Sequence, residues 1–205
     1  MSLAVVYSRA RFGMDAPLVT VEVHLSNGLP SLSIVGLPET AVRESKVRVR
    51  GAILNSHFEF PARRITINLA PADLPKEGGR FDLPIALGIL TANRQIPANE
   101  LDRYEFAGEL ALSGELRPVA GILPLSVQCA RAGRSLVIAA GNADEAALSA
   151  NTRVICCRHL LDVTAHLSGT QRLEEYTRSH HAACRPSLPD LADVRGQHHA
   201  RRALE

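Results

Sequence analysis

The spacing of apolar residues changes along the first third of this chain, and the change restricts the folds that it can adopt. Val19, Val21, Val23 and Leu25 alternate with polar residues in LVTVEVHLS, which is the period-two pattern of a strand with one buried face. LAVVYSRA and PSLSIVGLP are β-type runs on either side of it. From Pro38 the period becomes helical. The residues that share one helical face are Val42, Ser45, Val49, Ala52 and Ile53.

Further strands and helices follow without strict alternation. Strands are predicted in RRITINLAP, RSLVIAA and RVICC, and a strand pair turning at Ser113-Gly114 in YEFAGELALSGELRPV. Helices are predicted over residues 82–93 and 159–167, in ILPLSVQCARAG with Gly133 after its last turn, and from Asn142. Asn27-Gly28 lies between two β-type runs and predicts a hairpin. This order predicts an α+β fold with a mixed sheet and packed helices.

The composition of the chain changes after Gly169. QRLEEYTRSHHAACRPSLPD is polar, contains two prolines and has no apolar period, which is typical of a linker. LADVRGQHHARRALE then begins a helical pattern. We therefore expect a domain over residues 1–169, a linker over 170–189 and the truncated start of another module over 190–205, so that the chain is the front of a longer protein.

The cysteine and apolar patterns indicate a cytoplasmic protein. The four cysteines have no Cys-x-x-Cys spacing, and the chain shows neither a signal-peptide run nor the ~20 apolar residues of a membrane span. At least one of Cys156 and Cys157 should be buried in its strand. The adjacent pairs His180-His181 and His198-His199 lack the spacing of metal ligands. With Cys184 nearby, these tail residues offer a weak adventitious site at most, and no metal site is predicted.

The PADLPKEGGRFDLPIALGIL segment resembles a catalytic loop that leads into a helix, yet it contains no Ser, Thr, Cys or His. Neither lysine has the upstream glycines of a Walker A loop, so no such loop is predicted. Gly78-Gly79-Arg80 could form a small anion-binding nest or a turn that requires a positive φ. A Ser-Lys dyad requires a lysine with a depressed pKa beside a serine. Glu77 is expected to keep Lys76 charged, and Lys46 is expected to be solvated.

The basic residues give a second lead. Although the net charge is only +2, the chain has 23 basic residues, of which all but Lys46 and Lys76 are arginine, the better residue for bidentate phosphate contact. If a helix and the following strand pack side by side, they could bring together one basic patch: Arg43, Lys46, Arg50, Arg63 and Arg64. Such a patch could bind a polyphosphate backbone, or it could be a solvated face.

Long motifs in this chain resemble the ComM/YifB family of magnesium-chelatase-related proteins. They are VGLPETAVRESKVRVRGAILNSHFEFPARRITINLAPADLPKEGGRFDLPIALGIL and GELALSGELRPVAGILP, and DVRGQHHARRALE resembles the entry helix of the family's AAA+ module. The resemblance implies a Lon protease proteolytic-domain-like fold, of the ribosomal protein S-five domain-two type. An ungapped comparison with the Lon motifs places Arg80 at the position of the catalytic serine and Leu123 at that of the lysine. The loop would then keep the scaffold without the peptidase.

The resemblance also implies a function. Family members resemble hexameric, ATP-driven motors that migrate branched DNA during natural transformation, with ATP and magnesium bound by the full-length protein. This segment, with no cofactor of its own, would contribute contact to single-stranded or branched DNA and ring assembly. Its KEGGRFD loop would line a subunit interface or face DNA through Lys76, Glu77, Gly78, Gly79, Arg80 and Asp82. Arg80 and Asp82 could pair within or between subunits.

Two alternatives stay open. One is a hydrolase with a displaced dyad, formed by Lys76 with Ser113 or Ser126. The other is an interaction domain that binds protein and not DNA.

Overall fold

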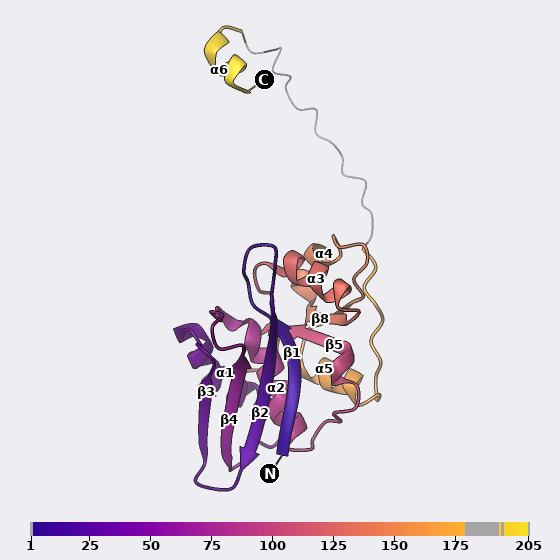
Figure 1. Cartoon of the computed structure of the whole chain (residues 1–205). Coiled ribbons are helices and arrows are strands. Elements are labelled where there is room, and N and C mark those ends of the chain that lie inside the picture. The colour runs from indigo at the N-terminus through magenta and orange to yellow at the C-terminus, as the bar shows by residue number, and fades with distance from the viewer. Residues whose placement is uncertain (1, 179–192, 194, 205) are drawn as a thin grey trace.

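The computed structural model of the chain describes residues 2–178, 193 and 195–204. Its first sheet, in residues 2–178, consists of β1 (Ser2–Arg9), β2 (Leu18–Ser26), β3 (Ser31–Val35) and β4 (Arg64–Ala70), in the order β1-β2-β4-β3 (Figure 1). β2 pairs antiparallel with β1 and β4, whereas β3 pairs parallel with β4. The sheet is therefore mixed, and the predicted α+β class is confirmed.

The predicted hairpin at Asn27-Gly28 is wrong. β4 lies between β2 and β3, so the chain crosses the end of β4 before it forms the edge strand β3. The α1 helix (Thr40–Asn55) then returns the chain in a crossover between the parallel strands β3 and β4. Ile65, Ile67 and Leu69 of β4 are buried, whereas the edge strand β3 has only exposed and partly buried side chains.

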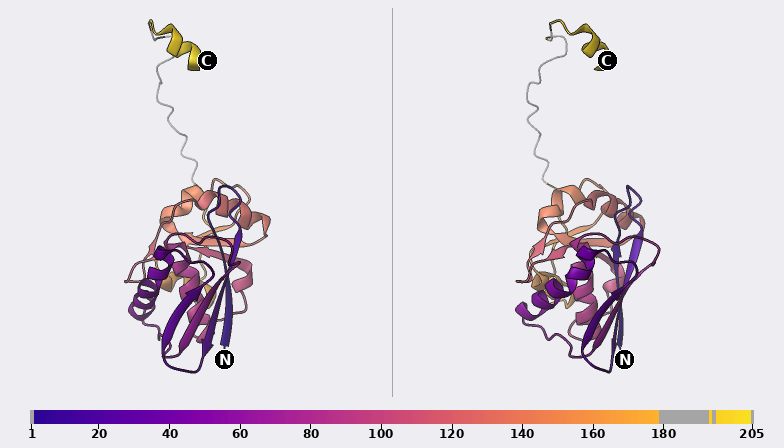
Figure 2. Two further views of the ribbon diagram at one scale, coloured as in Figure 1. Left: turned by 60° about the vertical axis from the view of Figure 1, so that its left-hand side comes forward. Right: turned by 90° about the vertical axis from the view of Figure 1, so that its left-hand side faces the viewer.

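The α2 helix (Asp82–Ala92) is the centre of the hydrophobic core. Each of its residues is buried, as expected for a helix that is apolar on all sides. It contacts β1 and β2 of the first sheet, the helix α1, and the later strands β5 and β6. Gly88 makes the approach to the sheet possible, because a Cβ at this position would lie 2.5 Å from Val23 Cγ2. Both α1 and α2 cover the same face of the first sheet (Figure 2).

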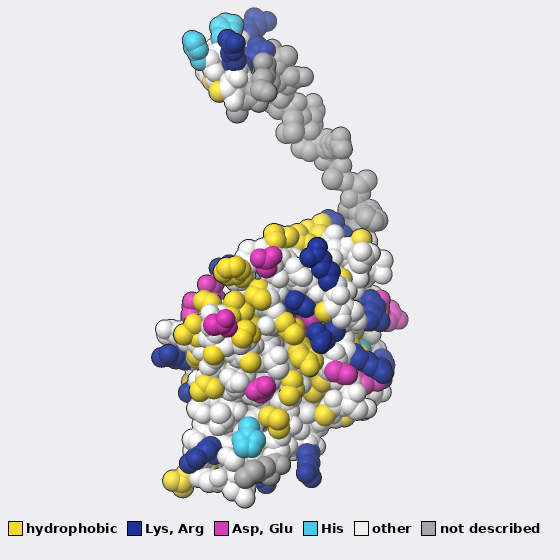
Figure 3. Space-filling model, in the orientation of Figure 1, with side chains coloured by type: hydrophobic (Ala, Val, Ile, Leu, Met, Phe, Trp, Pro, Cys, Tyr) yellow, Lys and Arg dark blue, Asp and Glu magenta, His cyan; other side chains and the backbone are white. Residues whose placement is uncertain are grey.

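The opposite face of the first sheet is open. It carries the side chains that alternate with the core residues, among them Leu3 and Val5, which are exposed. In Figure 3 apolar side chains gather over the middle of this face.

A second, parallel sheet follows, with the order β5-β8-β9. Its strands are β5 (Tyr104–Ala107), β8 (Ser135–Ala139) and β9 (Val154–Cys157). The predicted turn at Ser113-Gly114 is confirmed, since it joins the antiparallel strands β6 (Glu109–Leu110) and β7 (Leu116–Arg117). The buried Cys157 confirms that at least one thiol of the Cys156-Cys157 pair lies in the core. Burial raises the pKa of the Cys156 thiol to about 11 and raises that of Cys157 further.

Helices connect and cover the second sheet. They are α3 (Ile122–Arg131), α4 (Ala143–Ala146) and α5 (Leu160–Leu167), and short 3-10 turns lie at η1 (Gly79–Phe81), η2 (Leu101–Arg103) and η3 (Ala140–Asn142). Gly133 follows α3 with φ near 70°, as predicted for a residue just past a helix end. Among the described residues, no helix has the length and apolar character to cross a membrane.

Residues 170–178 lie against the second sheet. Tyr176 N–H donates to Val154 O at 2.7 Å, and Glu175 forms a bridge with Ile155. Beyond them, His180, His181 and Cys184 fall outside the described residues, while His198 and His199 open the short helix α6 (His198–Leu204). The division into a domain, a linker and a following module stays a prediction.

Candidate functional site at the start of the central helix

The KEGGRFD loop connects β4 to the central helix and is bonded to neighbouring elements. Pro38 forms a parallel bridge with Lys76, and Glu39 N–H donates to Lys76 O at 3.2 Å. Gly78 adopts φ 69° and ψ −174°, a conformation that favours glycine, and the helical segment starts at Gly79. The loop is therefore held against the N-terminus of α1 while it introduces α2.

Lys76 is enclosed by its own loop. Its side chain is fully buried, and its Nζ donates to Pro71 O. Burial lowers the pKa of Lys76, with Asp73 acting in the opposite direction. Glu77 does not fill the role predicted for it, because its carboxylate pairs with Arg11 at 3.1 Å.

The serines proposed as partners of Lys76 bond elsewhere. Ser126 Oγ donates to Ala146 O at 2.8 Å, and Ser113 Oγ accepts from Glu115 N–H at 3.4 Å. Lys76 Nζ itself bonds to Pro71 O. A displaced dyad would therefore require these side chains to rearrange.

Within the chain Asp82 pairs with Arg48 and not with Arg80, while a pair of Arg80 and Asp82 between subunits stays a prediction. Arg48 Nε lies 2.7 Å from Asp82 Oδ2 and its Nη2 lies 3.1 Å from Oδ1, a bidentate contact between α1 and α2. Leu110 N–H also donates to Asp82 at 3.2 Å. Burial raises the pKa of Asp82 to about 6 against the opposing effect of Arg48. The hydrogen bond to Asp82 raises the pKa of Arg48.

Arg80 points away from Asp82, toward the segment before α3. Its Nη2 donates to Ala120 O at 2.7 Å, and its Nη1 has no hydrogen-bond partner. Burial, followed by the charge of Arg11, lowers the pKa of Arg80. The loop that carries Arg80 thus adjoins the segment that leads to Leu123. Arg80 and Leu123 are the two positions that the resemblance matched to the serine and lysine of Lon. The N–H groups of Ile122 and Leu123 donate to Glu145, which occupies the N-terminus of α3.

A pocket of about 360 Å³ separates these two loops. Its lining comes from residues 77–80, from Glu109, from residues 118–120 and from Arg11 in the β1–β2 connection. Sequence reasoning missed Arg11 and Glu109, because nothing in the local pattern places them beside the loop. Among the described residues, no group of three or more His, Cys, Asp or Glu side chains could hold a metal ion.

The structure separates the members of the predicted basic patch, which we call the α1–β4 patch: Arg43, Lys46, Arg50, Arg63 and Arg64. Arg63 and Arg64 stand at the beginning of β4, whereas Arg43 lies near its far end, since Arg43 N–H donates to Glu39 O and Glu39 N–H to Lys76 O. Seven residues of β4 span roughly 20 Å. Arg50 stacks on Phe60, with 5.1 Å from its Cζ to the ring centroid. The exposed members therefore form two groups, and their contact with DNA stays a prediction.

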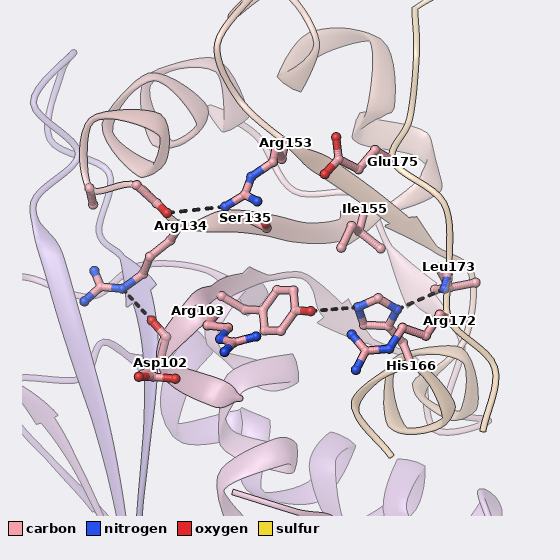
Figure 4. A pocket seen from close by; sticks show the side chains of 13 residues that line it. Asp102, Arg103, Arg134, Ser135, Arg153, Ile155, His166, Arg172, Leu173 and Glu175 are labelled. Atoms are coloured by element: carbon pink, nitrogen blue, oxygen red, sulfur yellow. Dashed lines mark hydrogen bonds between the residues drawn. The ribbon is translucent and has the colours of Figure 1, made fainter. Parts of the chain in front are cut away.

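The larger pocket, of about 720 Å³, lies elsewhere and is lined by arginines (Figure 4). We call these side chains the pocket arginines: Arg103, Arg134, Arg153 and Arg172. They come from separate segments, so no sequence pattern could have grouped them. Asp102 and Glu175 also line the pocket. Glu100 contacts both Arg103 and Arg172, at 3.5 and 3.2 Å, so one carboxylate faces two guanidinium groups.

His166 fixes the wall of this pocket. Its Nδ1 accepts a hydrogen bond from Leu173 N–H at 2.9 Å, so Nε2 carries the proton and faces Tyr104 Oη at 3.1 Å. Burial, followed by the charge of Arg172, lowers the pKa of His166. The neutral ring thereby holds residues 172–173 beside the pocket.

Comparisons with known proteins identify the class of protein that carries this fold and these loops. The family model described as subunit ChlI of Mg-chelatase matches residues 21–142, from β2 to η3. The match defines a magnesium-chelatase-related protein.

Curated relatives cover the whole chain. It is 51% identical over 208 residues to the competence protein ComM of Haemophilus influenzae and 50% identical over 205 residues to the uncharacterized protein YifB of Escherichia coli, with 100% of this chain covered in each case. The uncharacterized protein Rv2897c of Mycobacterium tuberculosis is 38% identical over 207 residues. The chain spans only 40–41% of the length of these relatives. It belongs to the ComM/YifB family of magnesium-chelatase-related AAA+ proteins.

Proposed function

We propose that this chain is the N-terminal domain of a cytoplasmic, ATP-driven DNA motor of the ComM type. The full-length protein would bind ATP and magnesium, assemble as a hexameric ring and migrate branched DNA during natural transformation and recombination. The proposal draws on a relative named as a competence protein, which covers this chain completely. Within the ring, the domain would contribute DNA contact and subunit contacts.

The observation that carries the DNA contact is the group of pocket arginines. The side chains of Arg103 and Arg172 are 70% and 59% exposed and share the single carboxylate of Glu100. Arg153 is exposed, and its hydrogen bond at 3.5 Å goes to Gly133 O, a neutral acceptor. These guanidinium groups therefore present positive charge to solvent at the rim of the larger pocket, where a phosphate group could contact them. Phosphate contacts from arginine are the main source of affinity for a nucleic-acid backbone.

A fluorescence-anisotropy titration tests this proposal. The chain is titrated with single-stranded, duplex and branched DNA at several salt concentrations. We expect the logarithm of the association constant to fall linearly with the logarithm of salt concentration. Replacing Arg103, Arg153 and Arg172 with Ala should weaken binding alike across sequences. It should also flatten the slope, by roughly 0.7–0.9 for each phosphate that the variant no longer neutralises.

The α1–β4 patch supplies the matched comparison. Replacing Arg43, Arg63 and Arg64 with Ala removes the same number of exposed positive charges from another surface. A flatter slope in this variant alone would locate the DNA contact there and refute the role of the pocket arginines. Absence of binding at low salt would move DNA contact to the ATPase module and leave this domain with assembly alone.

Two further measurements address ring assembly and the hydrolase alternative. Sedimentation velocity of the full-length protein with ATP and magnesium should give a hexamer, and a monomer would refute the ring. A serine-reactive fluorophosphonate probe should not label this chain. Labelling that disappears in Lys76→Ala would instead establish the displaced dyad.

A further inference from the structure

The smaller pocket, at the start of α2, contains a buried cation that forms no ion pair within residues 2–178, although the charges of Glu77 and Glu145 act on it from a distance. Arg80 is only 5% exposed, and its guanidinium group makes one hydrogen bond, from Nη2 to a backbone carbonyl. In residues 2–178 no carboxylate forms an ion pair with it, and Nη1 has no partner. A buried charge and a buried N–H group without partners both cost free energy. An anionic ligand would remove that cost.

The backbone of the same pocket supplies a second, independent feature. Gly78 and Gly79 precede the continuous helical segment formed by η1 and α2, whose first N–H groups have no acceptor within the helix. The positive end of the helix dipole lies at the same point. A Cβ built on Gly78 would meet no atom within 4 Å, whereas one built on Gly79 would collide with Glu109 Oε2, so the open space lies beside Gly78.

Arg11 completes the set of donors. It lines the pocket from the β1–β2 connection, and its side chain is 52% exposed. Its present partner is Glu77 at 3.1 Å, and both side chains reach solvent. An exposed pair of this kind contributes little free energy, so Arg11 can exchange this partner for a ligand. Glu109, the other acid in the lining, lies 3.7 Å from Arg117.

We propose that this pocket binds the phosphoryl group of a phosphate monoester. Arg80, Arg11 and the helix N-terminus all contribute N–H donors to the pocket lining, and a monoester offers three terminal oxygens to accept them. A planar carboxylate has two oxygens, and one guanidinium group is sufficient to bind both. The volume of about 360 Å³ falls within the range of small-ligand sites and leaves room for part of the esterified group.

The phosphoryl group has two possible sources, a free nucleotide and the 5′ end of a DNA strand. Both present a terminal monoester, whereas a phosphate inside a strand is a diester flanked by two sugars. A concave pocket selects the terminal group. The strand-end source rests on the proposed DNA function, but the free-nucleotide source does not.

Backbone-amide NMR of the ¹⁵N-labelled chain tests the site directly. The probes are inorganic phosphate, deoxyadenosine 5′-monophosphate, deoxyadenosine, sodium acetate, and one oligonucleotide with either a 5′-phosphate or a 5′-hydroxyl. We expect saturable shifts at the amides of Gly78 and Gly79 with the phosphate-bearing probes. Arg11→Ala should weaken the affinity for the monophosphate about tenfold, the loss expected for one charge-assisted contact.

Matched variants separate a binding role from a structural one. Arg131→Ala removes an exposed arginine from the end of α3, outside the pocket lining, and should leave the affinity unchanged. Arg80→Lys keeps the buried charge but removes the forked donor, and it should lower the affinity while the remaining amide spectrum stays folded. Because Arg11 is exposed, its variant keeps the test valid if replacement of Arg80 unfolds the chain.

Specific outcomes would overturn the inference. They are an absence of shifts at Gly78 and Gly79 with every phosphate probe, an equal affinity in Arg11→Ala, or equal shifts with acetate. If the monophosphate binds but neither oligonucleotide does, the pocket stands and DNA contact in this domain is refuted. If both oligonucleotides bind equally without shifting these amides while the monophosphate does shift them, DNA contact stands and the strand-end source is refuted in favour of a free nucleotide.

Discussion

Asp82 allows the electrostatics of the site to be tested through stability. It opens α2, is fully buried, and joins α1 through the bidentate contact with Arg48. Burial raises the pKa of Asp82 from 3.8 to about 6, and the hydrogen bond and charge of Arg48 only partly offset this effect. Desolvation thus outweighs the ion pair, as is common for buried pairs.

The sign of the pH dependence follows from linkage. Between about pH 4 and pH 6 the folded state keeps the proton on Asp82 while the unfolded state has released it, so stability falls as pH rises. The contribution is fully present below the unfolded pKa and is lost as the pH passes through the folded pKa. A shift of about 2 units, at 1.36 kcal/mol each, gives about 3 kcal/mol.

Urea unfolding at a series of pH values measures this contribution. Other carboxylates titrate in the same range, so the quantity of interest is the free energy of unfolding of the unmodified chain minus that of Asp82→Asn. This difference should decrease by about 3 kcal/mol between about pH 4 and pH 6. Asp102→Asn, at an exposed position, is the control. The free energy of unfolding of the unmodified chain minus that of this variant should change by no more than about 0.5 kcal/mol over the same pH range. A difference that is flat for Asp82→Asn, or that increases with pH, would refute the dominance of desolvation.

Three further substitutions test the packing that positions the site, each by urea unfolding. Arg9→Ala should lower the free energy of unfolding by about 3–5 kcal/mol, because it leaves the fully buried Glu105 without its bidentate partner at 2.6 and 2.8 Å. The double variant Arg9→Met with Glu105→Leu should recover most of this loss, and an equal loss in the single and double variants would contradict the explanation. Gly88→Ala should cost about 1–2 kcal/mol, because overpacking against Val23 exceeds the gain in helix propensity. The double variant Gly88→Ala with Val23→Ala should lose less stability than the sum of the two single variants, and strict additivity would show that the two side chains do not touch. Gly36→Ala should cost at least about 2–3 kcal/mol, since Gly36 has φ 97° and its Cβ would collide with a backbone carbonyl of β4, and a cost below about 0.5 kcal/mol would contradict this backbone geometry.

Most elements of the fold follow from local signals, whereas their pairing does not. The alternation from Val19 to Leu25 and the switch to a helical period after Pro38 correspond to β2 and α1. The failure at Asn27-Gly28 has a long-range cause. A good turn dipeptide permits a hairpin, but the parallel pairing of β3 with β4, about thirty residues later in the chain, determines the neighbour of β3.

The site could be predicted only as a location. The glycines and charges of the KEGGRFD loop indicated where the site lies, yet Arg80 and Asp82 do not pair within the chain. Asp82 lies at the start of a buried helix and faces α1, so Arg48 reaches it from an element more than thirty residues earlier. Arg48 was visible in the sequence, but it lies off the helical face shared by Arg43, Lys46 and Arg50. A sequence pattern can show which residues share a face and cannot show what faces them.

The bonds of the KEGGRFD loop determine the kind of function it can have. Lys76 bonds back to its own loop, Arg80 bonds to the segment before α3, and Asp82 bonds to α1 through Arg48. These contacts brace the loop internally and fix it to two other parts of the domain, so a ligand would meet donors that are already in position. Binding to such a preorganised site avoids much of the entropic cost of ordering a loop. The same contacts remove Lys76 from the pocket and commit Asp82 to a structural pair, so that Arg80 remains the buried charged group with unused donor capacity there. The geometry therefore favours recognition of an anion at this position over chemistry on it.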